Sequence, residues 1–354
     1  GLYEKHPEGY VLVAVRAEDE RETYEVASGT VCIARHAFEG QMYIRNVVLS
    51  EGVNRIEEEA FESCQALHQI SLPEGLLQIE ADAFRCCINL EGIDLPASLR
   101  MLGEHALTDT YGWSPSMNGI QYITVKPENP YFYNDAHAFY CRGENGDTLI
   151  KYFGKNEAWK IPKEVTEVGP MALRRANLRE VTIPETVKKI SKDAFQECGR
   201  LECMEIEADQ VKLYVPENPV YRKLEISGLF CQDTDGNLKY DYAAYDALLQ
   251  DWSQILIRCR MAAFRLEYPM QLSSAQKESY QALISEHLKD LVYDICKRES
   301  LKDLEALGRA GMITTENIED MIGWTTDCHR GKLTGYLMEY QSKYLGRDEF
   351  DFSL

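Results

Sequence analysis

Apolar residues recur at a fixed distance along the first part of the chain. The clearest marker is an Ala-Phe pair that returns every 23 positions, at Ala37-Phe38, Ala60-Phe61 and Ala83-Phe84, with a weaker copy at Ala106-Leu107. Other positions keep the same period: Ile33, Ile56, Ile79 and Leu102; Val47, Ile70 and Ile93; Leu49, Leu72 and Leu95; Cys64 and Cys87. A period of roughly 20–29 residues is typical of a solenoid, whose units bury their apolar face only by stacking. The pattern therefore predicts a repeat scaffold.

Each unit contains a short predicted strand, as residues 69–72 illustrate. Polar and apolar residues alternate there, which places Ile70 and Leu72 in the core and their neighbours outside. Pro73 ends the strand because it has no amide hydrogen to donate to a ladder. Phe61 is expected to fill the centre of its layer. Equivalent residues should then form straight columns along the solenoid.

Two later units drift in length but keep the frame, at residues 167–188 and 189–207. Partial units precede the complete ones at Thr23–Phe38 and Trp159–Gly169. These units resemble the BspA-type leucine-rich repeat family, whose repeat reads approximately I-x-x-x-A-F-x-x-C-x-x-L-x-x-I-x-L-P. The match is close for five units and spans approximately residues 22–240. The resemblance implies a solenoid with one short parallel strand per coil, and adhesion or host-protein binding as one option.

A second, longer echo predicts two β-hairpins inserted into the solenoid. The segment Lys126–Tyr133 is repeated at Val215–Tyr221, and each copy is followed by an apolar-aromatic run with a glycine turn. Apolar runs around Asn-Gly or Asp-Gly are typical of hairpins. We place the inserts near residues 134–152 and 224–240. Similar inserted hairpins occur in the BspA-type family that these repeats resemble.

From about Asp241 the apolar period becomes helical. Stripes over residues 252–266 and 280–295 predict two helices, the second capped by Ser273 with Gln276. Shorter helices are expected at 300–309 and 315–327, and a last one through residues 333–340. Their alternation with glycines is weakly similar to ankyrin-like helix pairs.

The predicted fold class is therefore α+β, a leucine-rich-repeat solenoid followed by an all-α domain. The expected boundaries are residues 1–22 for an N-terminal strand or cap, 23–240 for the solenoid and 241–354 for the helices.

The formal charge of −20 disfavours nucleic-acid partners, because a negative field repels phosphate backbones. No apolar stretch reaches the roughly 20 residues needed to cross a bilayer. The 11 cysteines form no disulfide framework, and Cys64, Cys87 and Cys198 share one repeat position, which favours a reducing, cytoplasmic location. A cell-surface or secreted location is the alternative if a signal peptide preceded residue 1. The sequence predicts no oligomeric state.

Metal, cofactor and catalytic motifs are not expected. In a calcium loop with Gly236 at the sixth position, Cys231 and Tyr242 would stand where acidic ligands are required. The seven histidines are scattered, and His36 and His105 occupy a repeat position at the coil surface. No nucleophile motif or phosphate-binding loop is present.

The outward strand positions are the predicted binding surface, because they line up in two columns of mixed polar residues. The candidate contact residues are Asn46, Gln69, Ser71, Asp94, Tyr122, Thr124, Glu180, Thr182 and Glu205, with the hairpin aromatics Tyr131, Phe132 and Tyr133. Aromatic side chains offer a large rigid contact area at low entropic cost. We predict a non-catalytic protein-interaction scaffold. The alternatives are a surface adhesin that binds host protein or glycan and, less favoured, an enzyme with its site in the helical domain.

Overall fold

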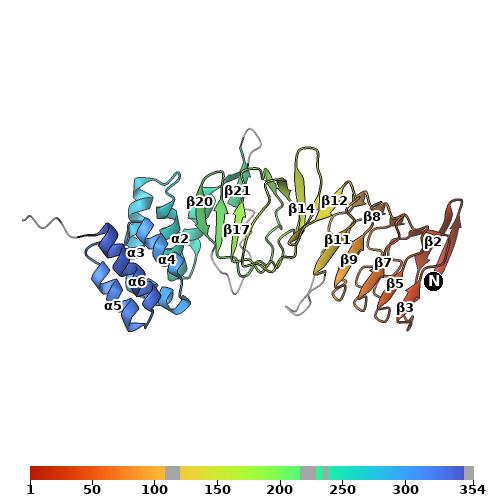
Figure 1. Ribbon diagram of the computed structural model, residues 1–354, viewed down its shortest axis with the longest axis horizontal. Helices are drawn as coiled ribbons and strands as arrows, with labels where there is room; N and C mark the ends of the chain where they lie inside the picture. The colour runs from red at the N-terminus through yellow and green to blue at the C-terminus, as the bar shows by residue number, and fades with distance from the viewer. Residues whose placement is uncertain (108–119, 216–228, 234–237, 347–354) are drawn as a thin grey trace, which may run out of the picture.

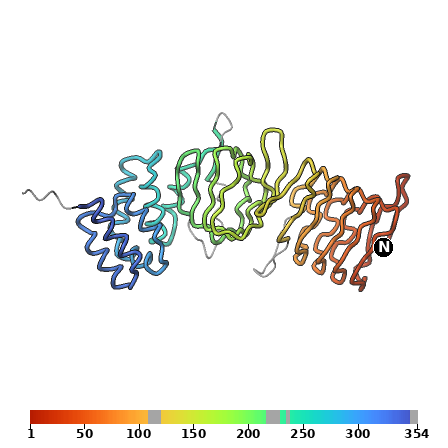
Figure 2. The backbone as a smooth tube through the Cα atoms, viewed as in Figure 1, coloured from red at the N-terminus to blue at the C-terminus, as the bar shows by residue number. Residues whose placement is uncertain are grey.

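The computed structural model describes residues 1–107, 120–215, 229–233 and 238–346. Three parts follow one another along an elongated molecule, as Figure 1 shows. We call them the first repeat segment (residues 23–125), the second repeat segment (149–215) and the helical part (241–346). The first repeat segment follows an N-terminal hairpin, and a second hairpin separates the two repeat segments (Figure 2).

The strands are short and arise at the positions that the repeat predicts. Before and within the first repeat segment they are β1 (Leu2–His6), β2 (Gly9–Ala14), β3 (Thr23–Glu25), β4 (Thr30–Ile33), β5 (Asn46–Val48), β6 (Arg55–Ile56), β7 (Gln69–Ser71), β8 (Gln78–Ile79), β9 (Gly92–Leu95), β10 (Met101–Leu102) and β11 (Tyr122–Val125). The remaining strands are β12 (Phe132–Asn134), β13 (Ala138–Cys141), β14 (Asp147–Tyr152), β15 (Ala158–Lys160), β16 (Val165–Val168), β17 (Glu180–Ile183), β18 (Lys189–Ile190), β19 (Cys203–Ile206), β20 (Val211–Tyr214), β21 (Phe230–Gln232) and β22 (Leu238–Tyr240).

Each coil of the first repeat segment contributes a strand to each of two sheets. One sheet has the order β1-β2-β4-β6-β8-β10, and β1 pairs with β2 in an antiparallel hairpin at its N-terminal end. The other side of the coil carries the parallel strands β3-β5-β7 and then β9-β11. The solenoid predicted from the repeat is therefore confirmed.

The predicted columns of side chains exist. The rings of Phe38, Phe61 and Phe84 stack nearly parallel, with centroids 4.6 Å and 5.1 Å apart. Backbone hydrogen bonds keep the coils in register, because the amide of Phe61 donates to the carbonyl of Ala83 at 2.9 Å. The cysteine column adds a further link: the Cys64 thiol donates to the Phe38 carbonyl at 3.0 Å. Successive coils are therefore superimposed, with equivalent atoms in line.

The hairpin at β13 and β14 divides the hydrophobic core. Phe139 packs with the first repeat segment, and its ring lies 5.8 Å from that of Phe132. Its neighbours Ala138 and Tyr140 belong to a second core that includes the second repeat segment. Since alternate side chains of a strand point to opposite faces, one strand closes both cores. Both predicted hairpins are present, β13 with β14 and β21 with β22, although residues 216–228 and 234–237 of the second region and most of the Val215–Tyr221 echo lie outside the described residues.

The second repeat segment continues the two-sheet arrangement. The sheet β12-β13-β14-β16-β18 lies on one side and β15-β17-β19-β20 on the other, with β20 antiparallel at the end. Leu173 and Phe195 follow the repeated alanines in these coils and are buried.

Six helices complete the described chain: α1 (Tyr242–Asp251), α2 (Ile255–Glu267), α3 (Ser274–Arg298), α4 (Leu301–Arg309), α5 (Ile318–Asp327) and α6 (Gly331–Tyr344). The predicted capping box at Ser273 and Gln276 is present, and Ser300 caps α4. Helix α1 was not predicted, since the expected helical stripe began only at Trp252. Its N-cap is Asp241, whose carboxylate accepts from the amide of Ala244.

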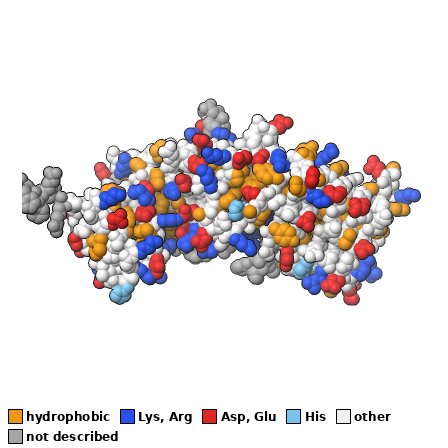
Figure 3. Space-filling model, viewed as in Figure 1, with side chains coloured by type: hydrophobic (Ala, Val, Ile, Leu, Met, Phe, Trp, Pro, Cys, Tyr) orange, Lys and Arg blue, Asp and Glu red, His pale blue; other side chains and the backbone are white. Residues whose placement is uncertain are grey.

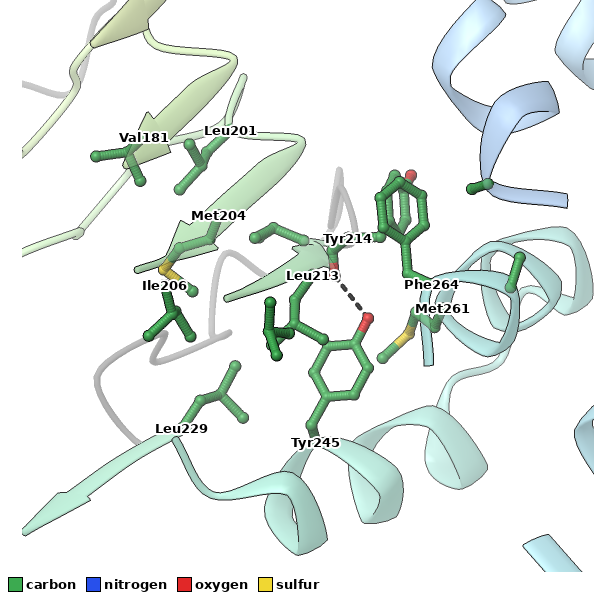
Figure 4. Close-up of a cluster of buried hydrophobic side chains, with 14 of the residues drawn as sticks. Val181, Leu201, Met204, Ile206, Leu213, Tyr214, Leu229, Tyr245, Met261 and Phe264 are labelled. Atoms are coloured by element: carbon green, nitrogen blue, oxygen red, sulfur yellow. Dashed lines mark hydrogen bonds between the residues drawn. The ribbon is translucent and has the colours of Figure 1, made fainter. Parts of the chain in front are cut away.

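The helical part shares its core with the second repeat segment, so the end of the solenoid is covered by helices. Figure 4 shows the ring of Tyr214 in β20 beside that of Phe264 in α2, and their centroids are 5.9 Å apart. The hydroxyl of Tyr245 in α1 donates to the carbonyl of Tyr214 at 2.7 Å. This contact joins the last strand to the first helix.

Candidate interaction surface

The outward residues of β3, β5, β7, β9 and β11 form one continuous set along the first repeat segment. Parallel pairing places Thr23, Asn46 and Gln69 side by side, and it aligns Gly92 with Tyr122. We call this set the strand face; its residues are Thr23, Glu25, Asn46, Val48, Gln69, Ser71, Gly92, Asp94, Tyr122 and Thr124. Eight of these ten side chains are exposed, and Asn46 and Gly92 are half-buried. Asn46, Gln69, Ser71, Asp94, Tyr122 and Thr124 were predicted from the sequence.

Thr23 and Glu25 extend the columns by one coil beyond the predicted set. They lie one period of 23 residues before Asn46 and Val48. The period itself could have identified them, because residues 23–38 read as a partial unit.

Tyr122 is the largest exposed side chain on the strand face, with 53% of its surface accessible. Its ring lies across Gly92 on the neighbouring strand, where a Cβ atom would overlap it. The absence of a side chain at Gly92 therefore lets the ring lie flat on the sheet. Beside it, Thr124 donates its hydroxyl hydrogen to the carboxylate of Asp94.

In the second repeat segment, the three predicted residues at equivalent positions have partners within the chain. Glu180 forms an ion pair with Lys302 of α4, although the lysine comes more than a hundred residues later in the chain. The Thr182 hydroxyl donates to Glu205 at 3.4 Å, and that carboxylate lies 3.3 Å from the ammonium of Lys212. These three predicted residues are half-buried. The structure therefore places them in equivalent columns, but with partners inside the chain.

The predicted hairpin aromatics have three different environments. Tyr131 is exposed, whereas Phe132 is only 3% accessible and packs on Phe139. The ring of Tyr133 is stacked on Tyr140, with a centroid separation of 4.8 Å, and its hydroxyl donates to Asp147 at 2.6 Å. Burial and that carboxylate raise the pKa of Tyr133. Phe132 is thus a core residue and is not part of the candidate surface. Of the three predicted aromatic residues, only Tyr131 is exposed.

One cluster of possible metal ligands lies on the turn side of the first repeat segment. Ligand atoms of His36, Glu39 and Glu62 all lie within 4.8 Å of one another. The imidazole of His36 is 3.2 Å from Glu39, and Glu62 forms an ion pair with Arg85. The carboxylates therefore have nearby cationic or titratable partners within the described structure. Four residues of the Asp233–Asn237 segment, considered above as a calcium loop, lie outside the described residues.

Buried charges in the helical part act as structural pairs. Arg265 is fully buried, and its guanidinium donates to both oxygens of Asp246 at 2.7 Å and 3.0 Å. Arg260 donates to Asp303 at 3.0 Å and also pairs with Asp294. Because each buried cation faces a carboxylate, these groups neutralise one another and tie the helices together.

An open pocket of about 450 Å³ lies where β22 meets the second repeat segment. Polar residues predominate in its described lining, which lies at the surface: Thr166, Glu185, Thr186, Lys188, Ala208, Leu238 and Lys239. The Thr186 hydroxyl donates to the carbonyl of Val165 at 3.0 Å, which orients it toward the backbone.

Comparison with known families accounts for the repeats. Residues 25–124 and 149–215 match six copies of the BspA type leucine-rich repeat region. The two repeat segments are BspA-type leucine-rich repeats. Such repeat proteins are generally protein-interaction scaffolds, typically non-enzymatic and often associated with the cell surface. The interruption between the two matched stretches coincides with the hairpin that divides the core.

Solved structures with a similar fold include three bacterial proteins. The pneumococcal vaccine antigen PcpA is 16% identical, with a TM-score of 0.41 over 58% of this chain and 70% of that one. The T. pallidum leucine-rich repeat protein TpLRR is 20% identical, with a TM-score of 0.32 over 56% and 87%. A leucine-rich cell surface protein from Faecalibacterium prausnitzii is 16% identical, with a TM-score of 0.28 over 58% and 76%.

No curated protein matches the sequence significantly. None of the described helices is both long and apolar enough to span a bilayer.

Proposed function

We propose that this protein is a non-catalytic scaffold that binds a protein partner through the strand face of its first repeat segment. The observation that carries the proposal is the contrast between equivalent positions. Gln69, Ser71 and Tyr122 are exposed on the strand face, whereas Glu180 and Glu205 in the second repeat segment pair with lysines of the same chain. A surface that is already neutralised internally offers less to a partner.

The composition of the strand face suits a protein. Tyrosine is enriched where proteins bind one another, and short polar side chains provide adaptable hydrogen bonds around it. Tyr131, on the segment that follows β11, adds a second exposed ring. The strands also hold these side chains on a rigid framework, which reduces the ordering cost of association.

Site-specific photocrosslinking tests which face binds. A benzophenone amino acid replaces Gln69 on the strand face or, as the control, Thr182 in the neighbouring outward column of the second repeat segment. We expect a crosslinked partner from cells with the probe at position 69 and none at position 182. Crosslinking at position 182 alone would contradict the proposal, and capture of a glycan in place of a protein would favour the adhesin alternative.

A reducing, cytoplasmic compartment remains the proposed location. The thiols of Cys64, Cys87 and Cys198 donate to backbone carbonyls one coil earlier, at 3.0, 3.1 and 2.9 Å, and a disulfide would remove these bonds. The frequent surface location of the family is the alternative. If the location is reducing, the protein taken from cells and denatured without reductant should be alkylated at all 11 cysteines. Disulfide bonds between cysteines, or cleavage by a protease added outside intact cells, would favour the cell surface.

A further inference from the structure

We infer that Tyr122 and its neighbouring carboxylates form a recognition site for a cationic side chain, an arginine or lysine, of the protein that binds the strand face. This inference rests on the proposed function and adds the chemistry of the partner. It starts from the one place on the strand face where an exposed aromatic ring and an acidic group occur on paired strands.

The ring is positioned to receive a cation. Because Tyr122 lies flat on Gly92, one face of its ring is covered by backbone and the ring remains 53% exposed. A cation over the face of an aromatic ring is attracted by the electron density of that face. The chain uses this contact elsewhere: the guanidinium carbons of Arg21 and Arg142 lie 4.6 Å and 4.5 Å from the ring centres of Tyr24 and Tyr133. Among the described cations that lie over tyrosine rings, none covers Tyr122.

Negative charge surrounds the ring. Asp94 is exposed two residues along from Gly92 on β9, and Thr124 fixes its carboxylate by a hydrogen bond. Glu91 is exposed immediately before this strand, and Lys126, immediately after β11, is paired with Glu74. Strands β9 and β11 carry no Lys or Arg. The combination of a ring face with carboxylates beside it is complementary to a guanidinium or ammonium group.

The charge of the whole region has the same sign. The first repeat segment holds 5 Lys and Arg against 14 Asp and Glu, a net charge of −9. The second holds 12 against 11, a net charge of +1. Figure 3 shows acidic and basic side chains intermingled on the visible face of the molecule. A basic partner would therefore be attracted to the first repeat segment as a whole and held at Tyr122.

The test measures binding of the full-length protein to a peptide probe, acetyl-Gly-Arg-Gly-Arg-Gly-Arg-amide, by isothermal titration calorimetry at low salt. The same peptide with citrulline in place of arginine keeps the shape and removes the charge. We expect Tyr122→Ala to weaken binding of the arginine peptide about five- to tenfold, in line with the strength of exposed cation–π contacts next to a carboxylate. Asp94→Asn should weaken it about threefold.

Gly92→Ala is the sharpest variant, because it leaves Tyr122 in place but pushes its ring away from the sheet. It should weaken binding about as much as Tyr122→Ala. Two variants control for ring loss and charge loss at other exposed sites, Tyr10→Ala and Glu8→Gln, and both should stay within twofold of wild type. Circular dichroism checks that each variant remains folded.

Three results would overturn the inference: no measurable binding of the arginine peptide, equal binding of the citrulline peptide, or equal weakening by the control variants, which would indicate diffuse attraction. Tyr122-dependent binding of a neutral oligosaccharide in place of the arginine peptide would also overturn it, in favour of a glycan. If a protein crosslinks at position 69 but its affinity is unchanged by Tyr122→Ala and Asp94→Asn, the proposed function is supported and the inferred cation site is wrong.

Discussion

The two repeat segments share one coil design but use their outward strands differently. In the first repeat segment the outward side chains are mostly exposed and the net charge is −9; in the second the outward residues of β17 and β19 are half-buried and the net charge is +1. The second segment also shares its core with the helices, through β20 and the contact between Tyr245 and Tyr214. The difference indicates a division of labour in which one segment presents a surface and the other anchors the helical part.

The cores are separate as well as the surfaces. The first repeat segment packs around the stack of Phe38, Phe61 and Phe84, and its core ends at Phe132 and Phe139. The second core runs from Ala138 through the helices to Leu337. A destabilising substitution in one core should therefore loosen the residues packed in that core before it affects those of the other core.

The largest expected effect comes from Phe61→Ala. Phe61 is fully buried between two stacked rings, so its truncation should lower the free energy of unfolding of the first repeat segment by about 3–5 kcal/mol. Denaturant unfolding gives the size of the loss, and hydrogen exchange should show faster exchange in residues 25–107 than in the second core. Gln69→Ala, on the exposed strand face, is the control and should change stability by less than about 0.5 kcal/mol. A loss below about 1 kcal/mol, or faster exchange throughout the chain, would contradict two separate cores.

Leu173→Ala provides the counterpart in the second repeat segment. Leu173 is fully buried in the core that continues into the helices, so the substitution should cost about 2–5 kcal/mol. Far-ultraviolet circular dichroism during unfolding should show the helices melting earlier together with this segment. Helices that keep their wild-type transition would show that the helical part folds by itself.

Tyr245→Phe examines the joint between the last strand and the first helix. The buried carbonyl of Tyr214 loses a donor, which should cost about 1–3 kcal/mol. Urea unfolding of this variant is compared with Tyr293→Phe, whose side chain is exposed on α3 and whose change should be negligible. Equal stability of the two variants would mean that the hydrogen bond contributes little to docking.

The smallest expected effect is a pH-dependent one, at Glu197 in the second repeat segment. Burial alone would raise the pKa of its carboxyl, but hydrogen bonds from Arg174 and Arg175 outweigh burial and hold the pKa below the usual 4.5. A lowered pKa in the folded state stabilises the protein above about pH 4.5, and this contribution is lost as the pH falls through the folded-state pKa.

Glu197→Gln should therefore reduce the free energy of unfolding by about 1 kcal/mol near pH 7, and by progressively less as the pH falls through the folded-state pKa. Thermal melts at several pH values measure the difference, and the exposed Glu185→Gln provides the comparison. A difference that is constant with pH would contradict the assigned role of the two arginines.

The sequence predicted the parts of the fold that are set by the repeat period and by helix-capping residues. The period of the alanine-phenylalanine pairs predicted the ring stack, and Ser273 and Ser300 predicted the starts of two helices. Helix α1 was missed although its buried residues Tyr245, Asp246 and Leu249 keep helical spacing, because one of them is an aspartate, buried against Arg265, which interrupts the apolar stripe.

The candidate surface could be predicted only in part, because the exposure of an outward residue depends on contacts with distant parts of the chain. Column membership follows from the repeat, so Gln69 and Ser71 were placed correctly as outward residues. Whether an outward residue has a partner within the chain depends on distant segments, as when Lys302 of α4 pairs with Glu180. The burial of Phe132 likewise depends on Phe139, on which its ring packs across the hairpin.

The hydrogen bonds between equivalent backbone atoms make the coil a modular unit of length. A duplicated copy of residues 62–84 would insert one more ring, one more thiol link and two more outward positions while repeating the backbone hydrogen bonds between coils. Each such copy would lengthen the binding surface by one strand spacing, about 4.8 Å. Extra residues between strands are also tolerated, because β9 and β11 pair in register at a spacing of 30 residues, whereas β5 and β7 pair at a spacing of 23.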